Sequence, residues 1–442
     1  MEAEVRIERY ADQGRCVAHI DGRVVFVRFA LPGELVRIEL DEPHDRDDRF
    51  WTAEVTEVLE PSPDRVEPAW PLAGPLAMDG GVGGADLVHV SLEGQLKWKA
   101  TTIGEQMRRL GHVDVGEVTV ERMPGDEAEP NGLGGLHWRT RIELIADEEG
   151  YASMRRRGSH TRVRLDGMPL ATNRLLDVAD REHVWDGGFT PGAQIRIAAP
   201  EPRLGDGDSG AGRTGADDAN AADDGNFAVL VGGEIVSGVA DLTERMSVEG
   251  HEFAYSVASS GFWQIHRMAP MRLPAYVMSL VHEVLGSRES AVLWDLYSGS
   301  GLFSLPMAAL AAPRTRMLTV EGAPEAVHHA RRNLREAGLD NVDARCGDVA
   351  ATLRNVPHDL SRPDMVVLDP PRAGARAKVC RQIAESGAPA VAYIACDPTS
   401  LARDTATFAS LGYEVAFIRA FDIYPMTHHV ETIALFSRTR KA

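Results

Sequence analysis

The sequence is poor in cysteine and has no long hydrophobic run. Its four cysteines, at positions 16, 346, 380 and 396 of 442, are too dispersed for a CxxC zinc pair and too few for a disulfide framework. No apolar stretch reaches the about 18 residues that a membrane-spanning helix needs. The opening "MEAEVRIERYADQG" is charged where a secretory signal is apolar. These absences predict a cytoplasmic protein with free thiols, no metal site and no membrane partner.

Positive charge is also scarce. The chain has 47 Lys and Arg against 66 Asp and Glu, a formal net charge of -19, which argues against a surface broadly coated for polyanions. Basic residues nevertheless concentrate between positions 97 and 157, although each one alone also fits an ordinary solvated face. The candidates for contact with an anionic partner are Lys97, Lys99, Arg139, Arg141, Arg155, Arg156 and Arg157.

Composition divides the chain into three parts. Residues 1–62 contain short alternating apolar runs separated by turn residues, which is typical of a small β-barrel. Residues 70–270 give mixed helical and strand-like signals and predict a mixed central domain. Within them, residues 201–226 are rich in Gly, Ala and Asp and almost bare of large apolar side chains, which predicts a disordered acidic insertion.

Residues 275–442 differ in character from the rest. Short apolar strands such as "AVLWDLY", "DMVVLDPP" and "AVAYIAC" alternate with amphipathic helical segments. That alternation predicts an α/β domain with a mostly parallel, doubly wound, Rossmann-like sheet. Ligands of such sheets gather at the carboxyl ends of the strands.

The first strand of this domain runs into a glycine turn, "WDLYSGSGLFSL". Gly299 and Gly301 allow a tight turn and close approach to a ligand, and Glu321, 20 positions after Gly301, can accept ribose hydroxyls. The third position of a dinucleotide fingerprint is Ser304 rather than glycine, which favours S-adenosylmethionine over NAD. Asp348 either meets an adenine amino group or caps a helix.

Three reactive side chains stand at predicted strand ends. Asp369 follows a strand in "VVLDPPRAG", Cys396 follows one in "YIACDPTSLARD", with Thr399 or Ser400 as helix cap, and Glu431 opens one in "YPMTHHVETIALF". Groups at strand ends of one sheet can converge over one crevice. We therefore expect Asp369, Cys396 and Glu431 to lie together.

A thiol and a carboxylate suit methyl transfer to carbon 5 of a uracil. Attack of a thiolate on carbon 6 makes carbon 5 nucleophilic, and a base must then remove the proton on carbon 5 before the thiol is eliminated. Cys396 and Glu431 fit these two roles. For a single cysteine at a strand end, a small buried hydrophobe is the alternative interpretation.

These segments resemble the RNA uracil-5 methyltransferases, which make 5-methyluridine in tRNA and ribosomal RNA. "DLYSGSGLFSL", "LDPPR", "IACDPTSLARD" and "PMTHHVE" are similar to four family motifs in family order, and "GFWQIH" resembles the FxQxN segment. The resemblance implies a class I methyltransferase domain, S-adenosylmethionine as cofactor, and an OB-like TRAM barrel at the N-terminus that binds RNA. It implies Cys396 as nucleophile and Glu431 as base, with cofactor or uracil contacts from Gln264, Tyr297, Glu321 and Asp369.

The chain departs from the family pattern at several positions. Asp397 replaces the Asn that usually follows the nucleophile, and His266 replaces the Asn of FxQxN, so we expect both changes to touch the active site. Many relatives also hold an iron–sulfur cluster on four cysteines. Because the corresponding positions are Leu76, Val82, Ala85 and Met168, we expect no cluster here.

The barrel is an unpromising main contact for RNA, because residues 1–68 carry 17 acidic residues against 9 arginines, a net charge of -8. This shifts the expected RNA contacts to the basic residues between 97 and 157. Trp98 and Trp138 could stack on an exposed base, although core packing is the alternative for each.

The sequence predicts a monomeric enzyme that methylates carbon 5 of a uridine in tRNA or rRNA. One alternative is an RNA cytosine-5 methyltransferase, whose fourth motif carries a second cysteine, whereas this chain reads Asp369-Pro370-Pro371. Another is a catalytically weakened relative that only binds RNA.

Overall fold

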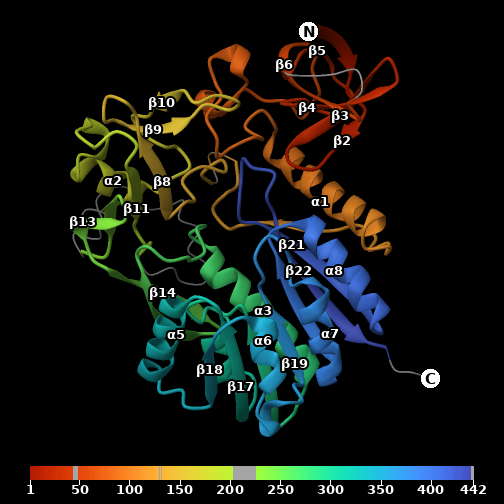
Figure 1. Ribbon diagram of the computed structural model, residues 1–442, viewed down its shortest axis with the longest axis vertical. Helices are drawn as coiled ribbons and strands as arrows, with labels where there is room; N and C mark the ends of the chain where they lie inside the picture. The colour runs from red at the N-terminus through yellow and green to blue at the C-terminus, as the bar shows by residue number, and fades with distance from the viewer. Residues whose placement is uncertain (43–47, 129, 131, 203–224, 440–442) are drawn as a thin grey trace.

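The computed structural model describes residues 1–42, 48–128, 130, 132–202 and 225–439. Three larger sheets and one two-stranded ribbon lie in these residues. Figure 1 shows the N-terminal barrel and the central sheet side by side above the C-terminal sheet and its helices. The predicted α/β fold with an N-terminal barrel is confirmed.

The barrel is a six-stranded sheet with the order β1-β5-β6-β4-β3-β2. The β3–β4 hairpin turns at Asp21-Gly22, where both residues have positive φ, of 50° and 80°. Asp-Gly suits such a turn because its twist matches that of the strands. The strands are β1 (Glu2–Arg6), β2 (Arg9–Tyr10), β3 (Arg15–Ile20), β4 (Arg23–Arg28), β5 (Leu35–Leu40) and β6 (Trp51–Glu60).

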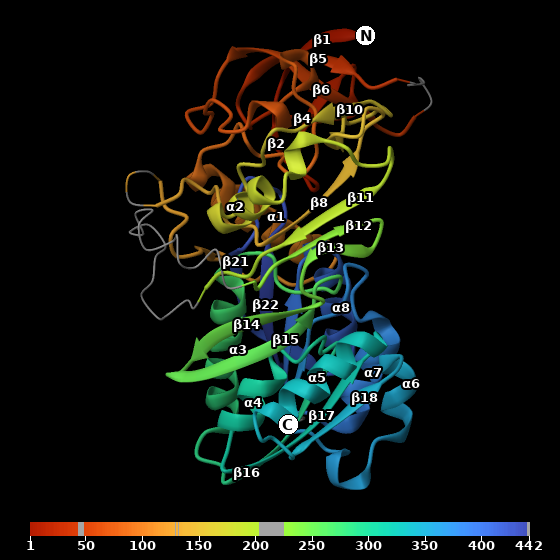
Figure 2. The same cartoon turned by 90° about the vertical axis from the view of Figure 1, so that its left-hand side faces the viewer.

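The central sheet is antiparallel, with the order β10-β9-β8-β11-β12-β13. Most of the acidic insertion, residues 203–224, lies outside the described residues, so its predicted disorder stays a prediction. The elements are β8 (Arg141–Ala146), β9 (Ala152–Arg155), β10 (Arg162–Arg164), α2 (Asn173–Arg181), β11 (Gln194–Ala198), β12 (Ala228–Val231) and β13 (Glu234–Gly238). The ribbon of β14 (Asp241–Val248) and β15 (His251–Ala258) crosses from the central sheet to the C-terminal domain (Figure 2).

The C-terminal sheet has eight strands in the order β18-β17-β16-β19-β20-β22-β21-β7. The strands from β18 to β20 are parallel, and β22 is antiparallel to β20. The strands are β16 (Ser290–Leu296), β17 (Arg314–Glu321), β18 (Val342–Cys346), β19 (Met365–Leu368), β20 (Ala390–Ala395), β21 (Tyr413–Asp422) and β22 (Glu431–Arg438). The helices are α3 (Ala269–Leu285), α4 (Ser304–Leu310), α5 (Pro324–Glu336), α6 (Val349–Thr352), α7 (Arg376–Ser386) and α8 (Pro398–Ser410).

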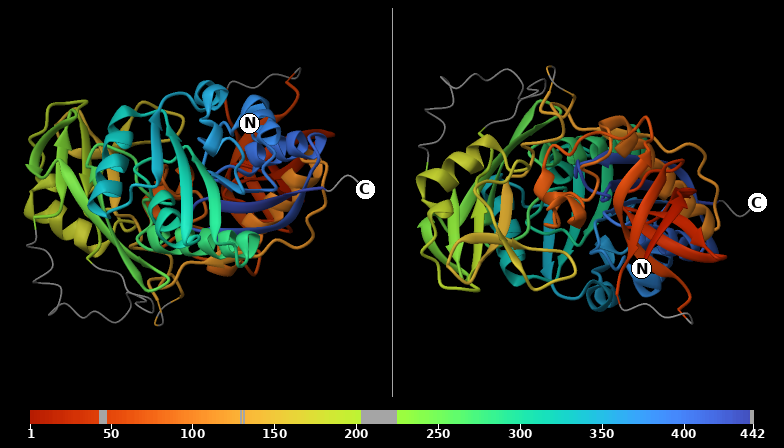
Figure 3. Two further views of the ribbon diagram at one scale, coloured as in Figure 1. Left: turned by 90° about the horizontal axis from the view of Figure 1, so that it is seen from below. Right: turned by 90° about the horizontal axis from the view of Figure 1, so that it is seen from above.

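Alternate residues of each strand build two hydrophobic cores, one on each face of this sheet. Leu293 packs with α3 and α4 on one face, whereas Trp294 packs with α7 and α8 on the other. Figure 3 shows the sheet lying between these two helical layers. The double winding leaves the carboxyl ends of the parallel strands open toward the barrel and the central sheet.

One element of the predicted central domain pairs with the C-terminal sheet. β7 (Val120–Arg122) lies parallel to β21 at the sheet edge, and α1 (Leu92–Arg109) packs along α8. The range 70–270 therefore does not describe a separate packing unit. A three-residue strand gives too short a pattern to detect in sequence, and its pairing depends on residues about 300 positions away.

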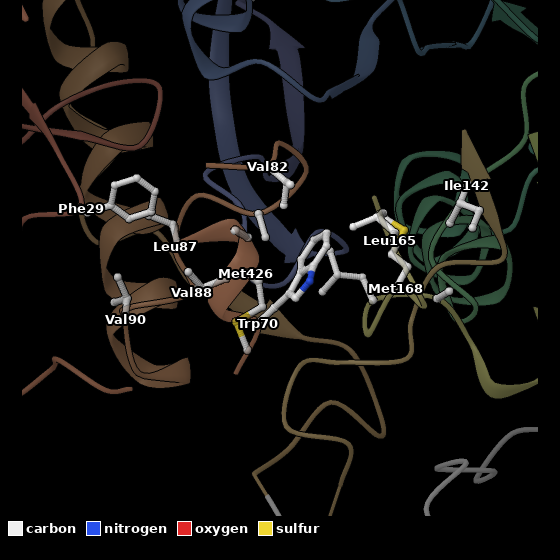
Figure 4. Packing of buried hydrophobic residues seen from close by; sticks show 14 of the residues in the cluster. Phe29, Trp70, Val82, Leu87, Val88, Val90, Ile142, Leu165, Met168 and Met426 are labelled. Atoms are coloured by element: carbon white, nitrogen blue, oxygen red, sulfur yellow. The ribbon is translucent and has the colours of Figure 1, made fainter. Parts of the chain in front are cut away.

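The positions aligned with the family's cluster cysteines carry apolar side chains. Val82, Ala85 and Met168 are buried, and Leu76 is half-exposed. Figure 4 shows Val82, Met168 and Met426 around the indole of Trp70. None of the four supplies a thiolate, so these residues do not fit an iron–sulfur cluster.

In the part of the chain that the structure describes, no helix has both the length and the hydropathy needed to cross a membrane.

Candidate active site

The predicted nucleophile and base lie next to each other at one edge of the C-terminal sheet. In the antiparallel pairing of β20 with β22, Ala395 is opposite Thr432. Cys396 directly follows Ala395, and Glu431 directly precedes Thr432, so the two residues face each other just beyond the ladder. Asp369 follows β19, the other neighbour of β20. The predicted convergence of these three strand ends is therefore present in the fold.

The Cys396 thiol is half-buried among acidic groups. Burial raises its pKa to about 12, and the carboxylates of Glu431 and Asp369 add to the increase, whereas the Arg372 guanidinium opposes it. The residue is therefore a protonated thiol at neutral pH in the unliganded protein. The position of Cys396 just before the start of α8 therefore does not by itself make its sulfur a thiolate.

Glu431 is almost completely buried, with 2% of its surface exposed. Burial, and then the adjacent Asp369, raise the pKa of Glu431 well above its usual value, while the nearby Tyr424 acts in the opposite direction. Its Oε1 atom has no hydrogen-bond partner among the described residues. The carboxyl group thus has one free oxygen in a dry environment.

Two further carboxyl groups stand at the ends of β16 and β19: Asp295 is fully buried, and Asp369 is partly buried. Burial raises the pKa of Asp369 to about 7, with Asp295 and Glu321 adding repulsion. Burial also raises the pKa of Asp295 to about 7, against a hydrogen bond from Ser304, and Asp295 Oδ1 has no partner in the described chain. Such a cluster is suited to a ligand that carries positive charge.

The glycine turn after β16 has the geometry that its sequence predicts. Gly299 and Gly301 have φ of +54° and +95°, and Tyr297 before them also has a positive φ, of 64°. A Cβ on Gly301 would lie 3.0 Å from Leu305 Cδ1. The Glu321 carboxylate accepts hydrogen bonds from Gly299 N at 3.1 Å and Ala323 N at 2.7 Å. Glu321 therefore anchors the turn at the end of β17, beside the crevice.

Asp348 caps a helix, one of the two roles that the sequence left open. Its Oδ1 atom accepts a hydrogen bond from Ala351 N at 2.8 Å, at the start of α6. The side chain is exposed at the end of β18. Capping occupies one of its two carboxylate oxygens.

Gln264 lies in the segment between β15 and α3, and is buried, with Oε1 lacking a partner among the described residues. It lines a small pocket with residues that include Thr140, His266 and Arg267. An unpartnered buried amide oxygen is a candidate ligand contact.

The two departures from the family motifs have structural explanations. His266 is fully buried, bonds Asp126 Oδ2 through Nε2 at 2.7 Å, and accepts from Met268 N at 3.0 Å. It acts as an internal brace between Asp126 and the start of α3, and the expectation that it touches the active site stays a prediction. Asp397 caps α8 by accepting from Ser400 N at 3.0 Å, which corrects the prediction of a Thr399 or Ser400 cap.

Most of the basic residues predicted to contact RNA are not free at the surface. The Lys99 ammonium is buried against Asp422, and Arg141 is buried 3.1 Å from Glu244. Arg157 donates to the carbonyls of Ala73, Gly74 and Val82, and so ties the turn after β9 to the segment after the barrel. These assignments are wrong because the sequence does not show which cations have buried partners.

Arg139 is partly buried. Burial lowers the pKa of its guanidinium, which lies 5.2 Å from the centroid of the Trp138 ring. Trp138 and Trp98 are buried in the core, as the alternative interpretation has it. Lys97 and Arg155 are exposed, and Arg156 is partly so, which leaves these three as surface cations.

Replacement of Lys99 by Ala is expected to lower the free energy of unfolding by about 3–5 kcal/mol, because it leaves Asp422 as a buried charge without its cation. Urea unfolding monitored by tryptophan fluorescence measures the change. Lys97→Ala is the matched control: its side chain is 68% exposed, and we expect an effect within about 0.5 kcal/mol. Equal effects of the two variants would contradict the assignment of Lys99 to a stabilising ion pair.

Sequence reasoning missed Tyr424, Arg372 and Asp295 around the crevice. Arg372 stands in the quoted "LDPPR" and Tyr424 in "YPMTHHVE", so motif position was an available signal for both. Asp295 lies near the end of an apolar strand. An acidic residue at a position expected to be buried is a sign of a functional site, and this sign was available in the sequence.

Comparisons with known proteins agree with this arrangement. The family model of tRNA (uracil-5-)-methyltransferases matches residues 231–439, and the TRAM domain model matches residues 2–58. An uncharacterized RNA methyltransferase of Bifidobacterium longum is 68% identical over 99% of this chain and 97% of the relative. The 23S rRNA (uracil(1939)-C(5))-methyltransferase of Shewanella amazonensis is 30% identical over 98% of this chain and 95% of the relative.

Among solved structures, the Pyrococcus abyssi tRNA (uracil-54, C5)-methyltransferase in complex with S-adenosyl-L-homocysteine superposes with a TM-score of 0.62. It is 19% identical, with 98% of this chain and 99% of that chain covered, and the likeness supports the fold. With its N-terminal TRAM domain and a C-terminal domain that matches the uracil-5 family model, the chain belongs to the S-adenosylmethionine-dependent RNA uracil-5 methyltransferase family.

Proposed function

We propose that this enzyme methylates carbon 5 of a uridine in tRNA or rRNA through a covalent bond between Cys396 and carbon 6 of the ring. The observation that carries the proposal is the juxtaposition of Cys396 and Glu431 across the β20–β22 pair, with Asp369 beside them. A thiol and a carboxyl group at one strand edge supply the nucleophile and the base that this chemistry needs.

The residues of the crevice fit S-adenosylmethionine. The glycine turn and Glu321 would hold the nucleoside, and the carboxyl groups of Asp295 and Asp369 would face the cationic end of the molecule. Gln264 Oε1 and Tyr297 are further contacts in this proposal. When bound, the cofactor supplies an electrophilic methyl group on a sulfonium.

The protein groups act in a fixed order in this mechanism. Arg372, whose guanidinium favours the ionised form of the thiol, assists Cys396 as its sulfur bonds to carbon 6. The ring electrons then reach carbon 5, which would take the methyl group as the bond between that group and the sulfonium breaks, with the electron pair left on the cofactor sulfur. Glu431 removes the proton from carbon 5, the carbon 5–carbon 6 double bond re-forms, and the carbon–sulfur bond breaks.

The raised pKa of Cys396 indicates that the thiolate forms only once substrate is in place. With a pKa of about 12, very little of the thiol is ionised in the free enzyme. A methyl sulfonium beside the buried carboxylates adds positive charge, which favours the thiolate. The free enzyme is thereby protected from adventitious oxidation and alkylation at Cys396.

Of the basic residues predicted from sequence to contact RNA, we propose that those with exposed or partly exposed side chains do so. Lys97, Arg155 and Arg156 carry exposed or partly exposed charge, and Arg155 pairs with Arg162 in the β9–β10 hairpin at the edge of the central sheet. Arginine side chains on such an edge suit phosphate oxygens.

Nucleoside analysis tests the proposed function. Purified enzyme is incubated with methyl-labelled S-adenosylmethionine and unmodified bacterial tRNA and rRNA, and the RNA is digested to nucleosides. We expect the label in 5-methyluridine. Label in 5-methylcytidine would favour the cytosine alternative, and absence of transfer to either RNA would favour a protein that only binds.

A further inference from the structure

The loop between β21 and β22, which leads into Glu431, is held by a segment more than 300 positions earlier in the chain. The backbone amide of Met426 donates to Gln95 Oε1 at 2.8 Å, and its carbonyl accepts from Leu87 N at 2.9 Å. The Met426 side chain packs in the apolar core that Figure 4 shows. Helix α1 and the segment before it therefore fix the first part of this loop.

Asp86 holds the next part of the loop at two points. Its Oδ1 atom accepts a hydrogen bond from His428 N at 2.9 Å, and its Oδ2 atom is bonded to His428 Nδ1. Burial acts to raise the pKa of Asp86, but the hydrogen bonds and charge of His428 lower it below its usual value, so the group is a carboxylate. Because a carboxylate only accepts hydrogen bonds, Nδ1 of His428 carries the proton.

His429 connects this pair to Arg372. The rings of His428 and His429 lie with their centroids 4.1 Å apart. Arg372 Nη2 is 3.4 Å from His429 Nε2, and because a guanidinium only donates, Nε2 is the acceptor. Burial, and then the charges of His428 and Arg372, lower the pKa of His429 to about 3, so the imidazole is neutral and keeps this lone pair.

The bond between Arg372 and His429 bridges the end of β20. Arg372 follows β19 and His429 precedes β22, and β20 lies between these two strands in the sheet. Cys396 directly follows β20, so the strand ends on both sides of the thiol are joined by this bond.

A neutral acceptor suits an arginine in this place. The Arg372 side chain is exposed, and His429 is the only hydrogen-bond partner of its guanidinium in the part of the chain that the structure describes. Without that partner, a long side chain with free rotamers would extend into water. Because the imidazole carries no charge, it fixes the guanidinium without cancelling its positive charge, as a carboxylate would.

We propose that Asp86 and His429 are positioning residues for the first half of the reaction: Asp86 fixes the His428–His429 pair, and His429 holds the Arg372 guanidinium over the Cys396 sulfur. The guanidinium favours loss of the thiol proton to solvent and takes no proton itself. The inference rests on the proposed role of Cys396 as nucleophile and deepens it, because it assigns functions to two residues outside the predicted site.

Arg372 is the one cation among the groups around the thiol, so its placement decides how easily the thiolate forms. The charged and titratable groups that face Cys396 are Glu431, Asp369, Arg372, Asp397 and Tyr424. Those that face His429 are His428, Arg372, Asp86, Lys99 and Tyr424.

His429→Phe keeps a ring and removes the acceptor, and alkylation of the free enzyme measures the result. The enzyme is treated with a small haloacetamide at mildly alkaline pH, without RNA or cofactor, and each cysteine peptide is quantified by mass spectrometry. Cys346, an exposed thiol, is the internal reference. We expect the rate at Cys396 relative to Cys346 to fall by about three- to tenfold, because one unit in the thiol pKa changes the thiolate fraction tenfold. His429→Gln, whose amide oxygen can accept from Arg372, should recover most of the rate.

A double-mutant cycle shows whether the effect passes through Arg372. Arg372→Ala should slow alkylation of Cys396 at least as much as His429→Phe does. In the Arg372→Ala background, neither His429→Phe nor Asp86→Ala should slow it further, although each should do so alone. His282→Phe is the matched control, because His282 pairs with Glu249 at 3.1 Å near the end of α3, and this variant should alkylate as the wild type does.

Circular dichroism checks that the variants fold. An unchanged rate at Cys396 in His429→Phe, or a slowing that persists in the Arg372→Ala background, would overturn the proposal. An effect of His429→Phe without one of Asp86→Ala would overturn the role of Asp86. Because the assay contains neither RNA nor S-adenosylmethionine, these outcomes are separate from product formation. Failure of the wild-type enzyme to make 5-methyluridine would instead overturn the proposed function.

Discussion

Replacement of Cys396 by Ala is expected to reduce formation of 5-methyluridine by roughly 10⁴-fold or more, because carbon 5 of an unactivated uracil is a poor nucleophile toward a sulfonium. Alanine keeps the position small and apolar at the end of β20, so the fold should survive. The measurement is transfer of labelled methyl groups to RNA under single-turnover conditions, with RNA affinity measured in parallel by filter binding.

The control for this variant is Cys16→Ala. Cys16 is a buried thiol on β3 of the barrel, outside the crevice, and its removal should leave turnover near that of the wild type. Residual activity of Cys396→Ala within tenfold of the wild-type rate would show that Cys396 is a small packing residue and not the nucleophile. The sequence alone leaves that alternative open.

Glu431→Gln should separate methyl transfer from product release. Glutamine is similar in shape but cannot accept a proton, so carbon 5 receives its methyl group and then keeps its hydrogen, and the carbon–sulfur bond persists. We expect steady-state turnover to fall by about 10³-fold. One methyl group per enzyme should still transfer, into a complex that survives denaturation.

Formation of the trapped complex should not be slowed by this substitution. Glu431 is one of the groups that raise the pKa of Cys396, so loss of its charge makes the thiolate easier to form. Glu414→Gln, an exposed change on the neighbouring strand β21, is the control and should turn over normally. Rapid release of methylated RNA by Glu431→Gln would show that another group is the base.

The sequence predicted those parts of the site that depend on strand ends. Asp369, Cys396 and Glu431 each stand where an apolar run stops or starts, and in a doubly wound sheet those points share one edge. The glycine turn was also predictable, because Gly299 and Gly301 require positive φ and only a few residue types tolerate it.

The errors concern charged residues whose partners lie far away in sequence. Lys99 and Arg141 stand in basic stretches that look solvated, yet they pair with Asp422 and Glu244 at separations of 323 and 103 positions. Local pattern carries no information on such pairs.

His266 illustrates a different limit. A motif substitution suggests a change in chemistry, but the imidazole is fully buried between Asp126 and the amide of Met268 and stacks on Trp138. Whether a residue in a motif touches substrate or braces the loop depends on its neighbours in three dimensions, which a single sequence does not show.

The central claim is that sulfur at position 396 bonds to the target ring. RNA in which uridine is replaced by 5-fluorouridine tests it, because fluorine cannot leave carbon 5 as the proton does and the adduct cannot resolve. After incubation with S-adenosylmethionine, the denatured complex is digested with protease and nuclease and the modified peptide is sequenced by mass spectrometry. The account predicts a methylated fluorouridine on Cys396; an adduct on another residue, or no adduct from an enzyme that makes 5-methyluridine in normal RNA, would contradict it.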